Sequence, residues 1–74
     1  MYVAVAEFDT AALASLLVSR LSECGFHPAP VAESAHVQLA GVDRAFTVEV
    51  PEGEQAGVIA FLRENGYAKH VVSP

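Results

Sequence analysis

The chain has 74 residues, and this length accommodates one small domain spanning residues 1–74. Nine acidic residues against four basic residues give a net charge of -5, so the overall field repels nucleic acid backbones and anionic lipid surfaces. Composition and charge therefore argue against nucleic acid and membranes as partners.

The cysteine content and the N-terminal segment predict the cellular compartment. Cys24 is the only cysteine, so no internal disulfide can form, and secreted domains of this size usually need such bonds. The segment from Met1 to Glu7 contains no basic region followed by a long apolar run, and no stretch approaches the roughly 18 apolar residues of a membrane span. We therefore expect a cytoplasmic protein in a reducing environment.

The first third of the chain predicts a strand followed by a helix. Tyr2 to Phe8 are almost entirely apolar on both faces, which is typical of a strand in the middle of a sheet. Asp9 and Thr10 offer capping oxygens to a helix that we expect from about Thr10 to Cys24, with Gly25 as its stop. Its predicted apolar face consists of Leu13, Leu16, Leu17, Leu21 and Cys24.

The middle of the chain predicts an edge strand and a second, more regular strand. Phe26 to Glu33 is extended but contains Pro28 and Pro30, which cannot donate ladder hydrogen bonds and therefore favour a sheet edge. Ser34 to Asp43 is predicted as a polar connection, although its alternation could also extend the hairpin. Arg44 to Val50 alternates cleanly between apolar and polar residues and predicts a strand.

The last third predicts a helix and a closing strand. Glu52 and Glu54 place negative charge where a helix dipole begins, and Asn65-Gly66 provides a stop. The apolar face of this helix is formed by Val58, Ile59, Phe61 and Leu62. Gly57 costs about 1 kcal/mol relative to alanine, for which a close approach to another element would compensate. Tyr67 to Val72 predicts a short final strand.

The order strand, helix, strand, strand, helix, strand predicts a ferredoxin-like α+β sandwich. With two right-handed crossovers, this order gives a four-stranded antiparallel sheet with both helices on one face. The first and third strands would then be central, and the second and fourth would be edges. This placement agrees with the apolar first strand and with the prolines of the second.

Several short segments resemble one family of small prokaryotic domains. They are Val5-Ala6-Glu7-Phe8, Leu21 to Phe26, Val31-Ala32-Glu33, Ala40-Gly41 and Val48 to Glu52. In this order they resemble an uncharacterised family assigned to signal transduction. The resemblance implies a ferredoxin-like fold and a regulatory or binding role, and it carries no catalytic residues over to this chain.

The residues that could hold a metal lack the spacing of a metal site. Cys24, His27, His36 and His70 form no Cys-x-x-Cys or His-x-x-x-His pair. Scattered surface histidines explain this pattern better. We therefore predict no metal and no cofactor, while any ligand-binding residues stay unassigned.

Catalytic chemistry also finds little support in the residue pattern. Cys24 lies where a helix dipole disfavours a thiolate, so we predict a small buried hydrophobic residue. Glu7 and Asp9 could form an acid pair at the end of the first strand, but a solvated strand end and a helix cap explain both residues more simply. No nucleophile elbow or glycine-rich phosphate loop accompanies them. We therefore predict no catalytic residues.

Two functional hypotheses follow. The first is a non-enzymatic regulatory module that binds a small molecule or a protein and self-associates as a homodimer, through the helix-free sheet face or an exposed edge strand. The alternative is a small enzyme or enzyme subunit that uses Glu7, Asp9 or His36 at the loop ends. A deep pocket in which a carboxylate and a histidine converge would favour the enzyme.

Overall fold

The computed structural model describes the backbone of residues 1–38 and 41–72, with side chains for residues 1–32 and 45–72. Its elements in chain order are β1 (Tyr2–Phe8), α1 (Ala11–Glu23), β2 (Ala32–Gln38), β3 (Gly41–Pro51), the 3-10 helix η1 (Glu52–Glu54), α2 (Gln55–Glu64) and the 3-10 helix η2 (Ala68–His70). No helix among these is long and apolar enough to cross a membrane.

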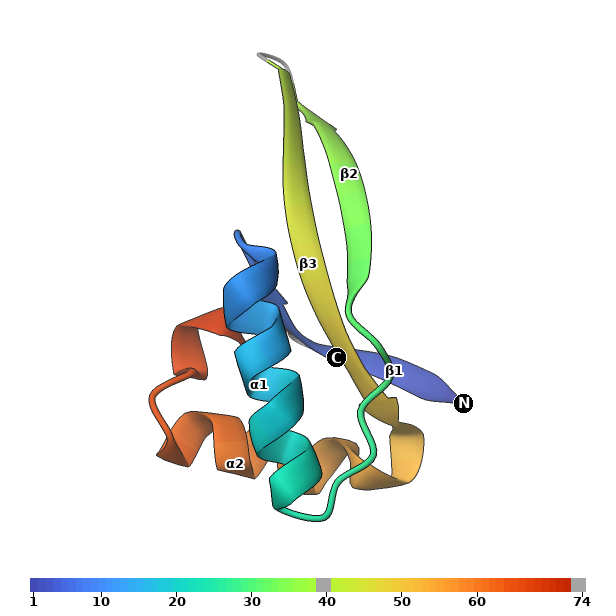
Figure 1. Ribbon diagram of the computed structural model, residues 1–74, viewed down its shortest axis with the longest axis vertical. Coiled ribbons are helices and arrows are strands. Elements are labelled where there is room, and N and C mark those ends of the chain that lie inside the picture. Colours follow the sequence, from blue (N-terminus) through green and yellow to red (C-terminus); the bar gives the residue numbers. More distant parts are fainter. Residues whose placement is uncertain (39–40, 73–74) are drawn as a thin grey trace.

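The described strands form one antiparallel sheet of three strands in the order β1-β3-β2. The prediction of a four-stranded ferredoxin-like sandwich is therefore wrong. The first strand, predicted to be central, lies at one edge, while β3 is the middle strand (Figure 1). The strand predicted from Arg44 to Val50 is present and longer than expected.

The predicted final strand, Tyr67 to Val72, is replaced by the 3-10 helix η2. Gly66 has a φ of 85°, the left-handed conformation that ends α2, and Ala68–His70 then coils into a single turn. Alanine and lysine are depleted in strands, so the β-branched residues that follow η2 are too few to form a ladder. Val71 forms only an isolated bridge, with Ala6 of β1.

The prolines place the second strand later than predicted. Residues 26–31 form an extended linker instead of a strand, because Pro28 and Pro30 have no N–H to donate. The linker is nevertheless bonded to the sheet, since the Ala29 N–H donates to the Glu49 carbonyl oxygen at 2.9 Å. Beyond the prolines, β2 pairs with β3 over its whole length, and their hairpin extends away from the helices (Figure 1).

Both helices pack with the sheet into one hydrophobic core. Its buried members are Val5, Ala6, Phe8, Ala14, Leu17, Leu21, Val48, Val50, Val58 and Leu62. Val48 and Val50 of β3 share one face of the sheet, and the register places Ala6 and Val3 of β1 opposite them. The helix-covered face of the sheet is therefore apolar at the junction of β1 and β3.

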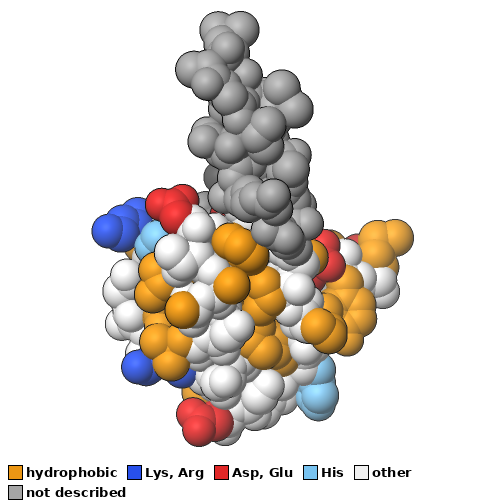
Figure 2. All heavy atoms as spheres, turned by 45° about the horizontal axis from the view of Figure 1, so that its top comes forward, with side chains coloured by type: hydrophobic (Ala, Val, Ile, Leu, Met, Phe, Trp, Pro, Cys, Tyr) orange, Lys and Arg blue, Asp and Glu red, His pale blue; other side chains and the backbone are white. Residues whose placement is uncertain are grey.

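The buried face of α1 differs from the predicted one. Leu17 and Leu21 are buried as expected, but Leu13 and Leu16 remain 44% and 47% exposed, and Ala14 takes their place in the core. Adjacent residues on a helix are only about 100° apart, so several overlapping sets of apolar residues can form its apolar face. Packing against the sheet decides which set is buried. The surface below the hairpin accordingly shows several hydrophobic patches separated by polar groups (Figure 2).

The two helices end in the same way. After α1, Gly25 has a φ of 92° and the Phe26 N–H donates to the Leu21 carbonyl at 3.0 Å. After α2, the Tyr67 N–H donates to the Leu62 carbonyl at 2.8 Å. These bonds define the same type of glycine stop, which leaves an aromatic residue packed beneath each helix end. Both predicted stops are confirmed.

The glycine inside α2 lies beside the aromatic ring at the end of α1. A Cβ at position 57 would lie 3.4 Å from Cε1 of Phe26, which is ordinary van der Waals contact. The predicted close approach is therefore present. It would nevertheless accommodate an alanine at this position.

Candidate functional site

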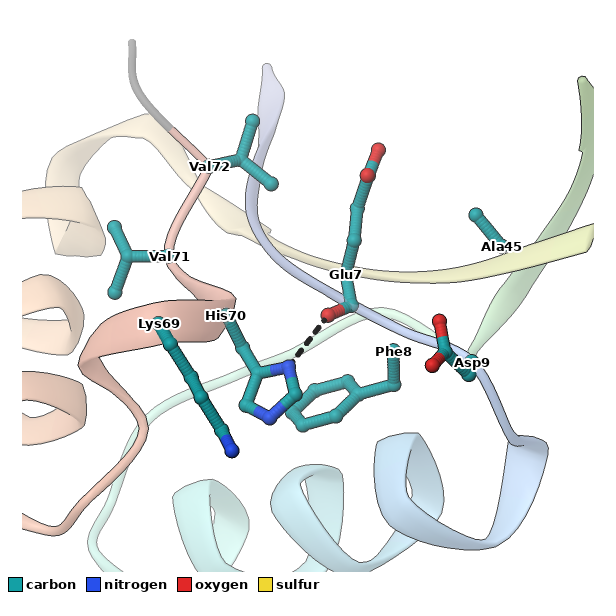
Figure 3. Close-up of a pocket in the computed structure, with 8 residues that line it drawn as sticks. All are labelled: Glu7, Phe8, Asp9, Ala45, Lys69, His70, Val71 and Val72. Atoms are coloured by element: carbon teal, nitrogen blue, oxygen red, sulfur yellow. Dashed lines mark hydrogen bonds between the residues drawn. The ribbon is translucent and has the colours of Figure 1, made fainter.

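A pocket of about 350 Å³ lies at the C-terminal end of β1, where the segment after η2 meets the sheet (Figure 3). Its lining residues come from β1 and the turn that follows it, from β3, and from residues 69–72, the C-terminal segment. They are Glu7, Phe8, Asp9, Ala45, Lys69, His70, Val71 and Val72. Residues more than sixty positions apart in the sequence are thus brought together at one edge of the sheet.

His70 is held in place at this edge by two contacts with β1. Its Nδ1 donates to the carbonyl oxygen of Glu7 at 3.2 Å, and its ring stacks on Phe8 with the centroids 4.5 Å apart. The imidazole therefore satisfies a carbonyl that a fourth strand would otherwise satisfy with a backbone N–H. Because Nδ1 is engaged in this way, only Nε2 is left to interact with a ligand.

The C-terminal segment is attached to β1 by few interactions. Beyond the bridge from Val71, the Val72 N–H donates to the carbonyl oxygen of Val5 at 3.0 Å. Tyr67 packs edge-on against Phe8, with ring centroids 6.1 Å apart. Phe8 contacts both His70 and Tyr67 and is only 2% exposed, so it anchors the segment that forms one wall of the pocket.

The polar groups around the pocket do not form an acid–base pair. The two carboxylates that the sequence offered as an acid pair, those of Glu7 and Asp9, both line the pocket and are exposed. Figure 3 shows the Glu7 carboxylate pointing away from the ring of His70, whose drawn hydrogen bond is to the backbone. General acid–base catalysis needs its groups within hydrogen-bond reach of a common reacting atom. The hydrogen bond of the His70 ring is to the Glu7 backbone and not to either carboxylate.

The histidine in this pocket differs from the one that the sequence singled out. His36 was the histidine considered with Glu7 and Asp9, and its side chain lies outside the described part. His70 was interpreted only as one of several scattered histidines. No local pattern marks it, because its position depends on the return of the chain to β1 across 63 residues.

Cys24 is exposed at the C-terminal cap of α1, so the prediction of a buried hydrophobic residue is wrong. Cys24 follows the last helical residue, Glu23, and its backbone leaves the helical conformation (φ -87°, ψ 3°), so the apolar stripe of α1 does not determine its burial. Among the described side chains, no three His, Cys, Asp or Glu residues are arranged to hold a metal ion.

A second polar contact joins the linker to the start of α2. The backbone N–H of His27 donates to Oε1 of Glu54 at 2.8 Å, and its Nδ1 lies 2.6 Å from Oε2. The side-chain and backbone hydrogen bonds from His27 lower the pKa of the Glu54 carboxyl most, desolvation opposes them, and the charge of His27 adds a smaller lowering. His27 itself is 75% exposed, so this clamp positions the linker and encloses no cavity.

Comparison of the chain with known protein families, curated proteins and solved structures found no match. The functional argument therefore rests on the chemistry of the pocket and of the sheet edges.

Proposed function

We propose that this protein is a non-enzymatic regulatory module that binds a small organic cation in the pocket at the end of β1. The observation that carries the proposal is the composition of this pocket: Glu7 and Asp9 line it together with the apolar side chains of Phe8, Val71 and Val72. A ligand with an ammonium or guanidinium group and a short apolar part would match both features.

The charge balance favours a cation over an anion. Two carboxylates line the pocket against one ammonium group, that of Lys69. The net charge of -5 also raises the concentration of cations near the protein surface. Electrostatics thus supports a cationic ligand, while the apolar wall supports an organic one over a simple metal ion.

The regulatory part of the proposal rests on the location of the pocket. One wall is the C-terminal segment, which a single bridge and a few side-chain contacts hold against β1. A ligand that contacts both β1 and this segment would stabilise the docked arrangement, because it binds that arrangement better than any undocked one. Ligand binding would then be reported through the position of residues 69–72 relative to β1.

A matched pair of probes tests the sign of the charge. We expect n-butylammonium ions to shift the amide resonances of Phe8, Val71 and Val72 in NMR titrations, with a dissociation constant on the order of millimolar, as suits so small a ligand. Butyrate ions have a similar apolar tail and the opposite charge, and they should leave these resonances unchanged.

Two substitutions locate the recognition. Asp9→Asn should weaken the response to butylammonium severalfold. Glu64→Gln removes the same charge from an exposed position at the end of α2 and should leave the response unchanged. Equal responses to both probes, or equal effects of both substitutions, would contradict the proposed cation site.

A further inference from the structure

The outer part of the β2–β3 hairpin is a two-stranded ribbon. β1 pairs with β3 only from Phe46 to Pro51, whereas β2 pairs with β3 from Gly41 to Thr47. Residues 41–45 of β3 therefore have β2 as their single strand partner within the described chain. Two-stranded ribbons are marginally stable in water, and a third strand would stabilise this one.

One hydrogen bond shows which backbone groups of β3 point toward β2. The Ala29 N–H, on the β2 side of the sheet, donates to the carbonyl oxygen of Glu49. Backbone groups alternate in direction along a strand, so the N–H and C=O groups of Thr47 and Ala45 point toward β2, as the Glu49 carbonyl does. Their partners in β2 are Ala32 and Ser34, whose N–H and C=O groups point toward β3 to form the ladder.

The same alternation shows which backbone groups of β2 are left for another strand. Glu33, Ala35 and Val37 alternate with the residues whose backbone groups bond to β3. Their own N–H and C=O groups therefore point away from β3, in the plane of the sheet. Within the described residues, no strand pairs with this edge. These three alternate residues present a row of backbone hydrogen-bond donors and acceptors along the outer edge of β2.

The sequence of this edge contains neither lysine nor proline. Natural edge strands are commonly blocked by one of these residues. Pro28 and Pro30 precede the strand and limit the pairing surface to β2 itself.

We propose that β2 pairs antiparallel with β2 of a second copy of this chain, with the two-fold axis at Ala35. This register places Ala35 opposite itself, Ser34 opposite His36, and Glu33 opposite Val37. It therefore brings no like charges directly opposite each other and joins outward-pointing residues of both copies. The two sheets become one continuous sheet, and each ribbon gains the strand that it lacks.

A proline substitution tests this interface without removing a bond of the hairpin. Ala35→Pro deletes an N–H that points outward, so the β2–β3 ladder keeps its hydrogen bonds. Light scattering after size-exclusion chromatography should give about twice 7.8 kDa for the native chain at micromolar concentration, and the monomer mass for the variant. Ala35→Ser keeps the N–H and should remain dimeric.

A second variant tests the same interface even if the proline variant does not fold. Ala35→Lys keeps the N–H but places two positive charges opposite each other at the axis, which should weaken the dimer by roughly up to fivefold at low salt and less at high salt. A native chain that stays monomeric, or a folded Ala35→Pro variant that stays dimeric, would overturn the proposal. Neither result depends on the pocket at the end of β1.

Discussion

The two edge strands of the sheet differ in what contacts their outer side. At the β1 edge, the chain returns after η2 and covers the strand end with the ring of His70, the Val71 bridge and the Val72 hydrogen bond. At the β2 edge, no strand of the described chain pairs with the outward-pointing groups. One sheet thus forms a pocket at one edge, and at the other it presents the backbone groups through which we propose that it pairs with a second copy.

The origin of this difference lies just after two similar helix ends. Leu21 to Phe26 and Leu62 to Tyr67 both run from a leucine through a left-handed glycine to an aromatic residue. After Phe26, two prolines keep the chain extended until β2 begins. After Tyr67, the chain coils into η2, so a side chain instead of a strand completes the β1 edge.

The largest effect at the β1 edge is expected from Phe8→Ala. Phe8 is buried and contacts both His70 and Tyr67, so its removal should cost about 3–5 kcal/mol. A domain of this size has a total stability of roughly 4 to 11 kcal/mol, so the variant should be partly or fully unfolded. Chemical denaturation measures the loss, and a cost below about 1 kcal/mol would show that Phe8 does not anchor the segment.

A smaller loss is expected for His70→Ala. It removes the hydrogen bond to the Glu7 carbonyl and the stacking on Phe8, at a combined cost of about 1–2 kcal/mol. Faster hydrogen exchange at the Val72 amide should accompany the loss, because this amide is bonded to β1. His70→Phe keeps a ring and should retain part of the stability. Unchanged exchange at Val72 in His70→Ala would show that the histidine does not hold the segment.

The smallest effect concerns the linker that leads to the β2 edge. The hydrogen bonds from His27, a residue of this linker, lower the pKa of Glu54 below its ordinary value, so the stabilisation is complete above the unfolded pKa and is lost as the pH falls through the folded pKa. Glu54→Gln should therefore lower the Tm at about pH 7 and have little effect at about pH 2.

Glu52→Gln provides the control for that titration. Glu52 is exposed in the same 3-10 helix, so the substitution removes a similar charge without removing the contact to His27. A difference between Glu54→Gln and the native chain that does not change with pH would show that the Glu54 carboxylate does not stabilise the linker through its charge.

The pocket shows where prediction from the sequence succeeds and where it stops. The placement of Glu7 and Asp9 at the end of the first strand could be predicted, because both follow directly from the local strand and helix signals. The presence of Lys69 and His70 in the pocket could not be predicted, since it depends on how the chain returns to β1 after α2. The exposed position of Cys24 was missed because the sequence predicted a helix that includes Cys24, whereas α1 ends at Glu23 and Cys24 is its cap.

The sequence by itself determined the elements whose signals are local: β1, the two helices with their glycine stops, and the regular strand β3. Caps, prolines, left-handed glycines and residue alternation act over a few neighbouring residues, so they operate in any tertiary context. Only the tertiary structure decided that Leu13 stays exposed, that Ala68–His70 form η2 instead of a fourth strand, and that His70 reaches Glu7. These outcomes depend on competition between distant segments for one core and one sheet edge, and that competition leaves no local pattern.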